Sequence, residues 1–259
     1  MVGLEARPRT SANPTTAVRV ITYNLHKGRG PRHRDILEEA VHALVARAPD
    51  VLACQEVFWG AGEALQACHF ITEVLGNPFV FGPNAFYRRG CHGNATFAHM
   101  PIEGRANLDI SESRLERRGL LHTRLRDGAR RLEVFNVHFS LTTWQRRRQL
   151  QKLLAALPDD PTVPTLVCGD FNDWSSSIDR LVRRSGRLQN ALWQLPLRER
   201  LTFPAARPVF GLDRIYFSGL RAKSVRVLSG DPWARLSDHL PVEAELEPVS
   251  DDPGPTATN

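Results

Sequence analysis

Hydrophobic positions along the chain change repeatedly between two spacings, so the sequence predicts a fold that contains both strands and helices. Residues 18–25 are rich in apolar side chains and predict a buried strand, and the apolar residues of 35–46 recur at helical spacing. A second strand is predicted at 51–55 and a second helix at 63–75, which Gly76-Asn77-Pro78 ends. This alternation indicates the α/β class.

The middle of the chain is rich in strand patterns. Asp127-Gly128 separates two alternating runs and therefore predicts a hairpin. After residue 78 the predicted strands are 94–98, 105–110, 120–126, 131–138, 165–168, 212–217, 222–228 and 240–246, and the predicted helices are 143–157 and 177–184. Many strands with helices interspersed favour two packed sheets with helices outside.

The two ends of the chain differ from the rest in composition. Residues 1–17 and 249–259 are rich in Pro, Thr, Ser and Asp and are predicted to be disordered tails, which leaves 18–248 as one domain. The N-terminal segment lacks the apolar core of a secretory signal, and no apolar run approaches the roughly 18 residues of a membrane span. The four cysteines show no metal-type or redox-type pair spacing. We therefore expect a cytoplasmic protein with reduced thiols, and a monomer.

Positive charge is concentrated in one stretch. The 259 residues include 34 Lys and Arg against 28 Asp and Glu, a formal net charge of +6, and 42% are hydrophobic, which excludes a compositionally disordered chain. Ten arginines and three acids fall between Arg114 and Arg148, so this stretch carries +7 and the remainder carries −1. A basic surface favours partners that carry phosphate.

Several predicted strands end in polar side chains that a plain core would not need. These are Asn24, Glu56, His138, Asp170, Asn172, Asp213, Asp238 and His239. Taken singly, each has a structural explanation, such as a turn residue, a helix cap or a solvated acid. Together they offer oxygen ligands and hydrogen-bond donors that suit Mg²⁺ or Mn²⁺ better than zinc. No zinc signature, P-loop, dinucleotide fingerprint or serine-hydrolase elbow is present.

A series of short motifs carries a resemblance to a known family. In chain order they are TYNLH (22–26), QE (55–56), GNAT (93–96), NVHFS (136–140), GDFN (169–172), LDRIY (212–216) and SDHLPV (237–242). In order and spacing the chain resembles the endonuclease/exonuclease/phosphatase superfamily. That resemblance implies a four-layer α/β sandwich of the DNase I type, in which two packed mixed sheets are flanked by helices. It also implies a Mg²⁺-dependent phosphoester hydrolase, with Mn²⁺ as the other candidate ion.

The resemblance further implies a metal set and a hydrolytic set. Glu56 matches the principal metal ligand, Asn24 lies beside it, and Asp238 matches a position that binds or supports metal.

In the hydrolytic set, Asp170 matches the residue that aligns or deprotonates the attacking water, and Asn172 holds both it and the phosphate. His239 would donate a hydrogen bond to the phosphate and Asp213 would hold that imidazole, while His138 would contact a second phosphate oxygen.

Departures from the family pattern bear on the substrate. Residues 93–96 lack the glutamate that in DNase I-like nucleases pairs with the counterpart of His138. The segment 201–204 replaces a Trp- and Arg-rich segment of abasic-site enzymes, which argues against that repair activity. Nucleic acid and phospholipid head groups remain as substrate classes.

Three further residues are predicted to bind substrate. Arg146 and Arg147 open the helix that follows the NVHFS strand, and Asn94 belongs to the GNAT motif. A solvated helix face is the alternative for the arginines. The alternative for the whole chain is a catalytically silent module of the same fold that binds phosphate polymers or lipid.

Overall fold

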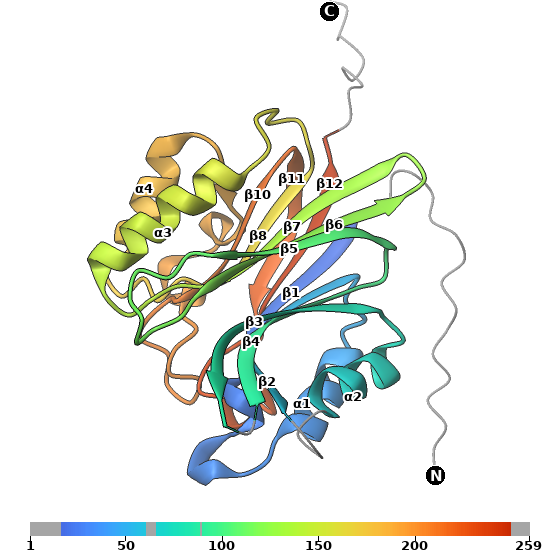
Figure 1. The fold of residues 1–259 in the computed structure, drawn as a ribbon, viewed down its shortest axis with the longest axis vertical. Coiled ribbons are helices and arrows are strands. Elements are labelled where there is room, and N and C mark those ends of the chain that lie inside the picture. Colours follow the sequence, from blue (N-terminus) through green and yellow to red (C-terminus); the bar gives the residue numbers. More distant parts are fainter. Residues whose placement is uncertain (1–16, 61–65, 89, 250–259) are drawn as a thin grey trace, which may run out of the picture.

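The computed structural model describes residues 17–60, 66–88 and 90–249. Apart from residues 17 and 249, the two predicted tails therefore lie outside the described residues, and their disorder stays a prediction. The described chain forms two stacked six-stranded sheets with helices on their outer faces (Figure 1). This confirms the predicted α/β sandwich. None of the helices in the described ranges has the length and apolar character that a membrane span requires.

The first sheet is built from both ends of the domain. Its strand order is β11 (Leu220–Val227), β12 (Val242–Pro248), β1 (Val18–Asn24), β2 (Val51–Gly60), β4 (Gly90–Ala98) and β3 (Phe79–Tyr87). Helices α1 (Leu37–Val45) and α2 (Gln66–Leu75) cover its outer face, where they pack on Ile21, Tyr23 and Leu52. The alternate residues of β1 and β2 point inward, toward the other sheet.

The second sheet has the order β5 (Ile102–Asp109), β6 (Gly119–Asp127), β7 (Arg130–His138), β8 (Thr165–Asp170), β10 (Asp213–Ser218) and β9 (Gln189–Asn190). Helices α3 (Thr143–Ala156) and α4 (Ser177–Ser185) cover its outer face. Figure 1 shows these helices and the α1–α2 pair on opposite sides of the two sheets. Val20, Ala53, Val134 and Ile215 belong to the core between the sheets.

Two of the observed strands are not predicted by the sequence pattern. β3 was not predicted because Gly82-Pro83 interrupts its apolar run, and β9 has two residues. Both are edge strands, and an edge tolerates proline because one side of the strand needs no ladder hydrogen bonds. The strand predicted at 51–55 continues to Gly60 as β2.

The topology brings the polar strand ends together. Each sheet is mixed, with one parallel pair, β1–β2 in the first and β7–β8 in the second. The carboxyl ends of parallel strands lie at the same edge of a sheet. Asn24 pairs with Gln55 in one sheet, and His138 pairs with Asp170 in the other. Because β10 runs antiparallel to β8, its first residue, Asp213, lies opposite Asp170.

Asn136 of β7 joins the two sheets near this edge. Its side-chain nitrogen donates to the carbonyl oxygens of Cys54 (3.1 Å) and Ala95 (2.9 Å) in the first sheet. Its side-chain oxygen accepts a 2.8 Å hydrogen bond from Gln55. The amide is fully buried and thus fixes the spacing of the sheets where the polar strand ends meet.

We expect Asn136→Ala to lower the free energy of unfolding by about 3 kcal/mol, because it leaves several buried polar partners unsatisfied. Urea denaturation measures the change. Asn107→Ala is the matched control, since the Asn107 amide also joins the sheets, by a 2.9 Å bond to the Pro83 carbonyl, but is exposed. Equal losses for the two variants would contradict the role given to Asn136.

Candidate active site

The buried carboxylate of Asp170 is the centre of the polar edge. Asp170 ends β8, and its Oδ2 lies 3.2 Å from the side-chain nitrogen of Asn24, 3.4 Å from Nε2 of His138 and 3.7 Å from Nε2 of His239. Its Oδ1 accepts a 2.8 Å hydrogen bond from the backbone nitrogen of Asn172. Burial raises the pKa of Asp170 to about 6, although His239 opposes the shift.

His239 is held by a second buried carboxylate. Its Nδ1 lies 2.9 Å from Oδ2 of Asp213. Burial lowers the pKa of His239, but the carboxylates of Asp213 and Asp170 outweigh it and raise the value to about 10. The ring is therefore protonated at neutral pH and both nitrogens are donors. Its Nε2 faces Asp170.

The segment 201–205 fixes this pair in place. The hydroxyl of Thr202 accepts hydrogen bonds from the backbone nitrogens of Leu212 (3.0 Å) and Asp213 (3.2 Å). The backbone carbonyl of Thr202 accepts a hydrogen bond from the backbone nitrogen of Leu240. The ring of Phe203 lies against His239, with 4.9 Å between ring centroids. This segment thus holds together two strand ends that are far apart in sequence.

His138 is a neutral counterpart to His239. It is buried at the end of β7, and burial together with the positive charge of Arg118 lowers its pKa well below the ordinary value. A neutral imidazole carries one donor and one acceptor nitrogen. The two histidines beside Asp170 therefore differ in charge.

Glu56 is placed by an irregularity in β2. The pairing of β2 with β4 gains one residue between Cys54 and Val57, and Glu56 has a φ of 53°. A non-glycine residue in this left-handed region is strained and occurs where a side chain has to be redirected. The Glu56 carboxylate lies 3.8 Å from Nζ of Lys27 and lines a cavity of about 240 Å³ together with His138 and Asn94.

Two groups of residues offer ligands for a metal. Asp170, Asp213 and His239 have ligand atoms within 4.8 Å of one another. The 2.9 Å contact between Nδ1 of His239 and Oδ2 of Asp213 also makes this group a hydrogen-bonded chain. Glu56 instead presents an anionic oxygen pair to the cavity, and oxygen ligands are those that Mg²⁺ and Mn²⁺ prefer.

Asn24 and Asp238 lie at the same edge as the metal candidate Glu56. Asn24 accepts a 3.0 Å hydrogen bond from the backbone nitrogen of His26, and its carbonyl accepts a 2.7 Å bond from the hydroxyl of Ser237. The carboxylate of Asp238 is partly exposed and lies 3.5 Å from Nδ1 of His26. These carboxylate and amide oxygens suit a hard cation, so the residues present fit the ion that the family resemblance implies.

The residues predicted to bind substrate have different surroundings. Asn94 is buried and donates to the backbone carbonyls of Gly119 and Asn136. Arg146 is also buried, and its guanidinium donates to the carbonyls of Ser140 and Leu141. Arg147, in contrast, is exposed on α3. Asn172 holds the backbone of Phe139 through its side-chain nitrogen, at 2.8 Å.

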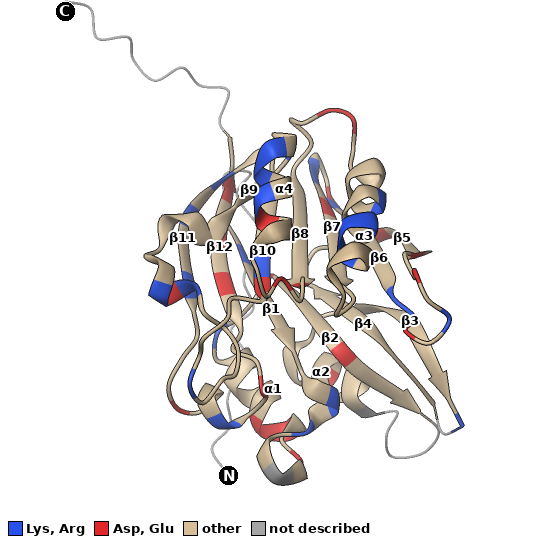
Figure 2. Cartoon of the chain, turned by 90° about the vertical axis from the view of Figure 1, so that its left-hand side faces the viewer, with Lys and Arg blue, Asp and Glu red and all other residues tan. Residues whose placement is uncertain are grey.

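Sequence reasoning assigned no site role to several residues that the structure brings to this edge. They are His26, Lys27, Arg118, Asn136 and Ser237. Asn136 and Ser237 belong to the NVHFS and SDHLPV motifs, so motif membership was an available signal for both. Figure 2 shows acidic positions where β1 and β10 meet at the centre of the view, and basic positions on α3 and α4.

The chain is similar in sequence and in fold to known proteins. The protein-family model described as "Endonuclease/Exonuclease/phosphatase family" matches residues 21–239. The chain is 33% identical over 244 residues to "Uncharacterized protein YbhP" of Escherichia coli strain K12, which covers 88% of this chain and 95% of that protein.

Solved structures share the fold at low sequence identity. An endonuclease/exonuclease/phosphatase from Beutenbergia cavernae has a TM-score of 0.74 at 19% identity, covering 90% of this chain and 72% of that one. TDP2 from D. rerio, complexed with single strand DNA product, has a TM-score of 0.72 at 14% identity, covering 89% and 98%. At these identities the likeness concerns the fold.

Proposed function

Because the chain belongs to the endonuclease/exonuclease/phosphatase family, we propose that it is a Mg²⁺-dependent hydrolase of phosphoester bonds. One observation carries the proposal: the buried Asp170 carboxylate lies among Asn24, His138 and a His239 that Asp213 keeps protonated. A base for water and a cationic donor for phosphate are thus side by side in one buried site.

Asp170 is the proposed base. Its pKa of about 6 leaves it ionised at neutral pH yet basic enough to take a proton from an attacking water. The hydrogen bonds from Asn24 and from the backbone of Asn172 orient the carboxylate. His239 donates from Nε2 to a phosphate oxygen, where negative charge grows as water attacks, and Asp213 keeps its ring oriented and charged.

Glu56, Asn24 and Asp238 are the proposed metal-holding residues, with Mg²⁺ as the ion and Mn²⁺ as its substitute. When bound there, the ion supplies positive charge for the phosphate oxygens. His138, whose Nε2 lies 3.4 Å from Oδ2 of Asp170, is proposed to contact a second phosphate oxygen. Nucleic acid and phospholipid head groups are the candidate substrates, and the neighbour with a DNA product supports the first of these.

Hydrolysis of bis-p-nitrophenyl phosphate tests the proposal. Purified protein should release nitrophenol with added Mg²⁺ or Mn²⁺ and stop in EDTA. Equal rates with and without metal would overturn the metal requirement. Tight binding of a phosphate polymer without cleavage under any divalent ion would favour the silent module instead.

We expect Glu56→Gln to raise the Mg²⁺ concentration for half-maximal activity by at least about 10-fold, since even outer-shell partners of metal ligands contribute that much. Calorimetric titration with Mn²⁺ should show the same loss. Glu116→Gln is the control, because Glu116 lines the same cavity from a different loop and should leave the half-activating concentration unchanged. Unchanged metal affinity in Glu56→Gln would remove Glu56 from the metal set.

A further inference from the structure

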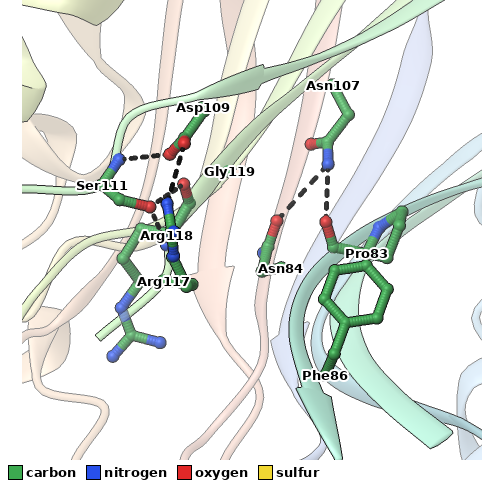
Figure 3. Close-up of a pocket in the computed structure, with 9 residues that line it drawn as sticks. All are labelled: Pro83, Asn84, Phe86, Asn107, Asp109, Ser111, Arg117, Arg118 and Gly119. Atoms are coloured by element: carbon green, nitrogen blue, oxygen red, sulfur yellow. Dashed lines mark hydrogen bonds and ion pairs between the residues drawn. The ribbon is translucent and has the colours of Figure 1, made fainter. Parts of the chain in front are cut away.

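Two cavities lie next to each other where the edge strands of the two sheets meet. The first, of about 240 Å³, contains Glu56 and His138. The second, of about 310 Å³, lies between β3 and β5 and is drawn in Figure 3. Asn84, Arg117 and Arg118 line both cavities, so the second cavity adjoins the one that contains Glu56 and His138.

Arg118 stands at the junction of the two cavities. One of its guanidinium nitrogens lies 2.8 Å from the carboxylate of Glu116, and its charge is close enough to His138 to lower the pKa of that ring. Its Nε is buried without a hydrogen-bond partner. The Arg118 side chain as a whole is 19% exposed, so a ligand would meet its other atoms and not the buried Nε.

Other arginines of the domain do not share this position. Arg146 and Arg214 also leave Nε unpartnered, but neither lines either cavity. Arg148 is engaged with Glu112 at 2.7 Å, which ties α3 to the loop after β5. Arg118 is thus an arginine that lines both cavities and lies close to His138.

We propose that Arg118 binds a second phosphate of the substrate, next to the one that is hydrolysed, and that the substrate is single-stranded nucleic acid. This inference rests on the proposed function for the identity of the reacting phosphate. Arg117 lines the same two cavities, and each of the two arginines is paired with an acid of the same wall, Arg117 with Asp109 at 3.2 Å and Arg118 with Glu116. A guanidinium matches phosphate in charge and in planar donor geometry.

The linings favour a nucleic acid over a lipid. The walls of both cavities are largely polar, with Lys27, Glu56 and Glu116 in the first and Asp109 and Ser111 in the second, and an acyl chain would bury these groups at a cost. Phe86, 75% exposed, lines the second cavity, and Tyr87, 58% exposed, lines the first. Exposed aromatic rings beside a basic wall are platforms on which unpaired bases stack.

Fluorescence anisotropy of a short labelled single-stranded DNA, in EDTA so that nothing is cleaved, tests the proposal without relying on turnover. Arg118→Ala should weaken binding by about 10-fold or more, the loss expected for a charged hydrogen bond. The slope of log affinity against log salt should fall by about 0.7, as for one lost phosphate contact on a single strand. Arg124→Ala is the matched control, since Arg124 is exposed on β6, the strand that follows Arg118, and lines neither cavity.

Arg118→Gln guards against a folding defect, because glutamine can still hydrogen-bond Glu116 but carries no charge. It should show the same decrease in salt slope. Unchanged affinity and slope in both variants would overturn the proposal, as would wild-type protein that binds phosphatidylglycerol vesicles but not the oligonucleotide. Activity on bis-p-nitrophenyl phosphate is measured in parallel, so failure of the hydrolase proposal is seen separately from failure of this one.

Discussion

Asp170→Asn should lower kcat on bis-p-nitrophenyl phosphate by about 10⁴-fold, the upper end of what a general base contributes. The substitution preserves shape, so the contact with the backbone nitrogen of Asn172 can persist and KM should change little. The folded protein should lose no stability. Burial raises the pKa of Asp170 to about 6, so its ionised form is disfavoured in the folded state, and the neutral amide removes that cost at neutral pH.

The control for this variant is Asp173→Asn. Asp173 is equally buried, but it accepts hydrogen bonds from the first residues of α4, including 3.1 Å from the backbone nitrogen of Ile178. We expect it to lower the melting temperature and to leave kcat within a few-fold. If Asp170→Asn kept more than a small fraction of wild-type kcat, Asp170 could not be the base.

His239→Ala should lower kcat by about 10³-fold, as expected when a donor to the developing phosphate charge is removed. Asp213→Asn tests how the ring is kept charged. Without the carboxylate at 2.9 Å the pKa of His239 should fall from its value of about 10. Because the protonated ring is the active form, activity is lost as pH rises through that pKa, so the alkaline limb of the pH profile should move to lower pH.

If Asp213 had only a structural role, Asp213→Asn would leave the alkaline limb of the pH profile unchanged. Asp179→Asn is a suitable control, since Asp179 also pairs with a buried aromatic partner, Tyr216 at 2.9 Å, on the same strand as Asp213. It should change stability while the shape of the pH profile stays as in the wild type. An unshifted limb in Asp213→Asn would mean that His239 does not titrate there.

Much of the polar edge could be predicted from the sequence, because an apolar segment that ends in polar residues shows where a strand ends. Apolar runs that end in Asn24, His138 and Asp170 indicated strand ends, and the fold confirms that these ends meet. The roles of the individual residues stay predictions. The extension of β2 beyond Gln55 and the backbone conformation of Glu56 could not be predicted, because a bulge depends on the register with β4, which lies far along the chain.

The positions of the arginines were predicted less well from the sequence. Arg146 was grouped with Arg147 because both open the same helix, but Arg146 precedes Leu150 and Leu153 by four and seven residues and so lies on the buried stripe of α3. That spacing was readable in the sequence. Its burial gives no support to the predicted substrate contact, whereas Arg147 on the exposed face keeps that prediction open. Arg118 belongs to the basic stretch between Arg114 and Arg148, but its position beside the site could not be predicted, because the meeting of two edge strands leaves no local pattern.

The irregular step in β2 has an evolutionary consequence. Leu52 and Cys54 face the helices before it, and Val57 and Trp59 face the same helices after it, so the strand changes phase by one residue. Loss of a single codon at Glu56 would restore a regular ladder with both apolar faces still in place. A lineage could therefore keep this fold while discarding the candidate metal ligand in one event, and relatives of similar shape need not share its chemistry.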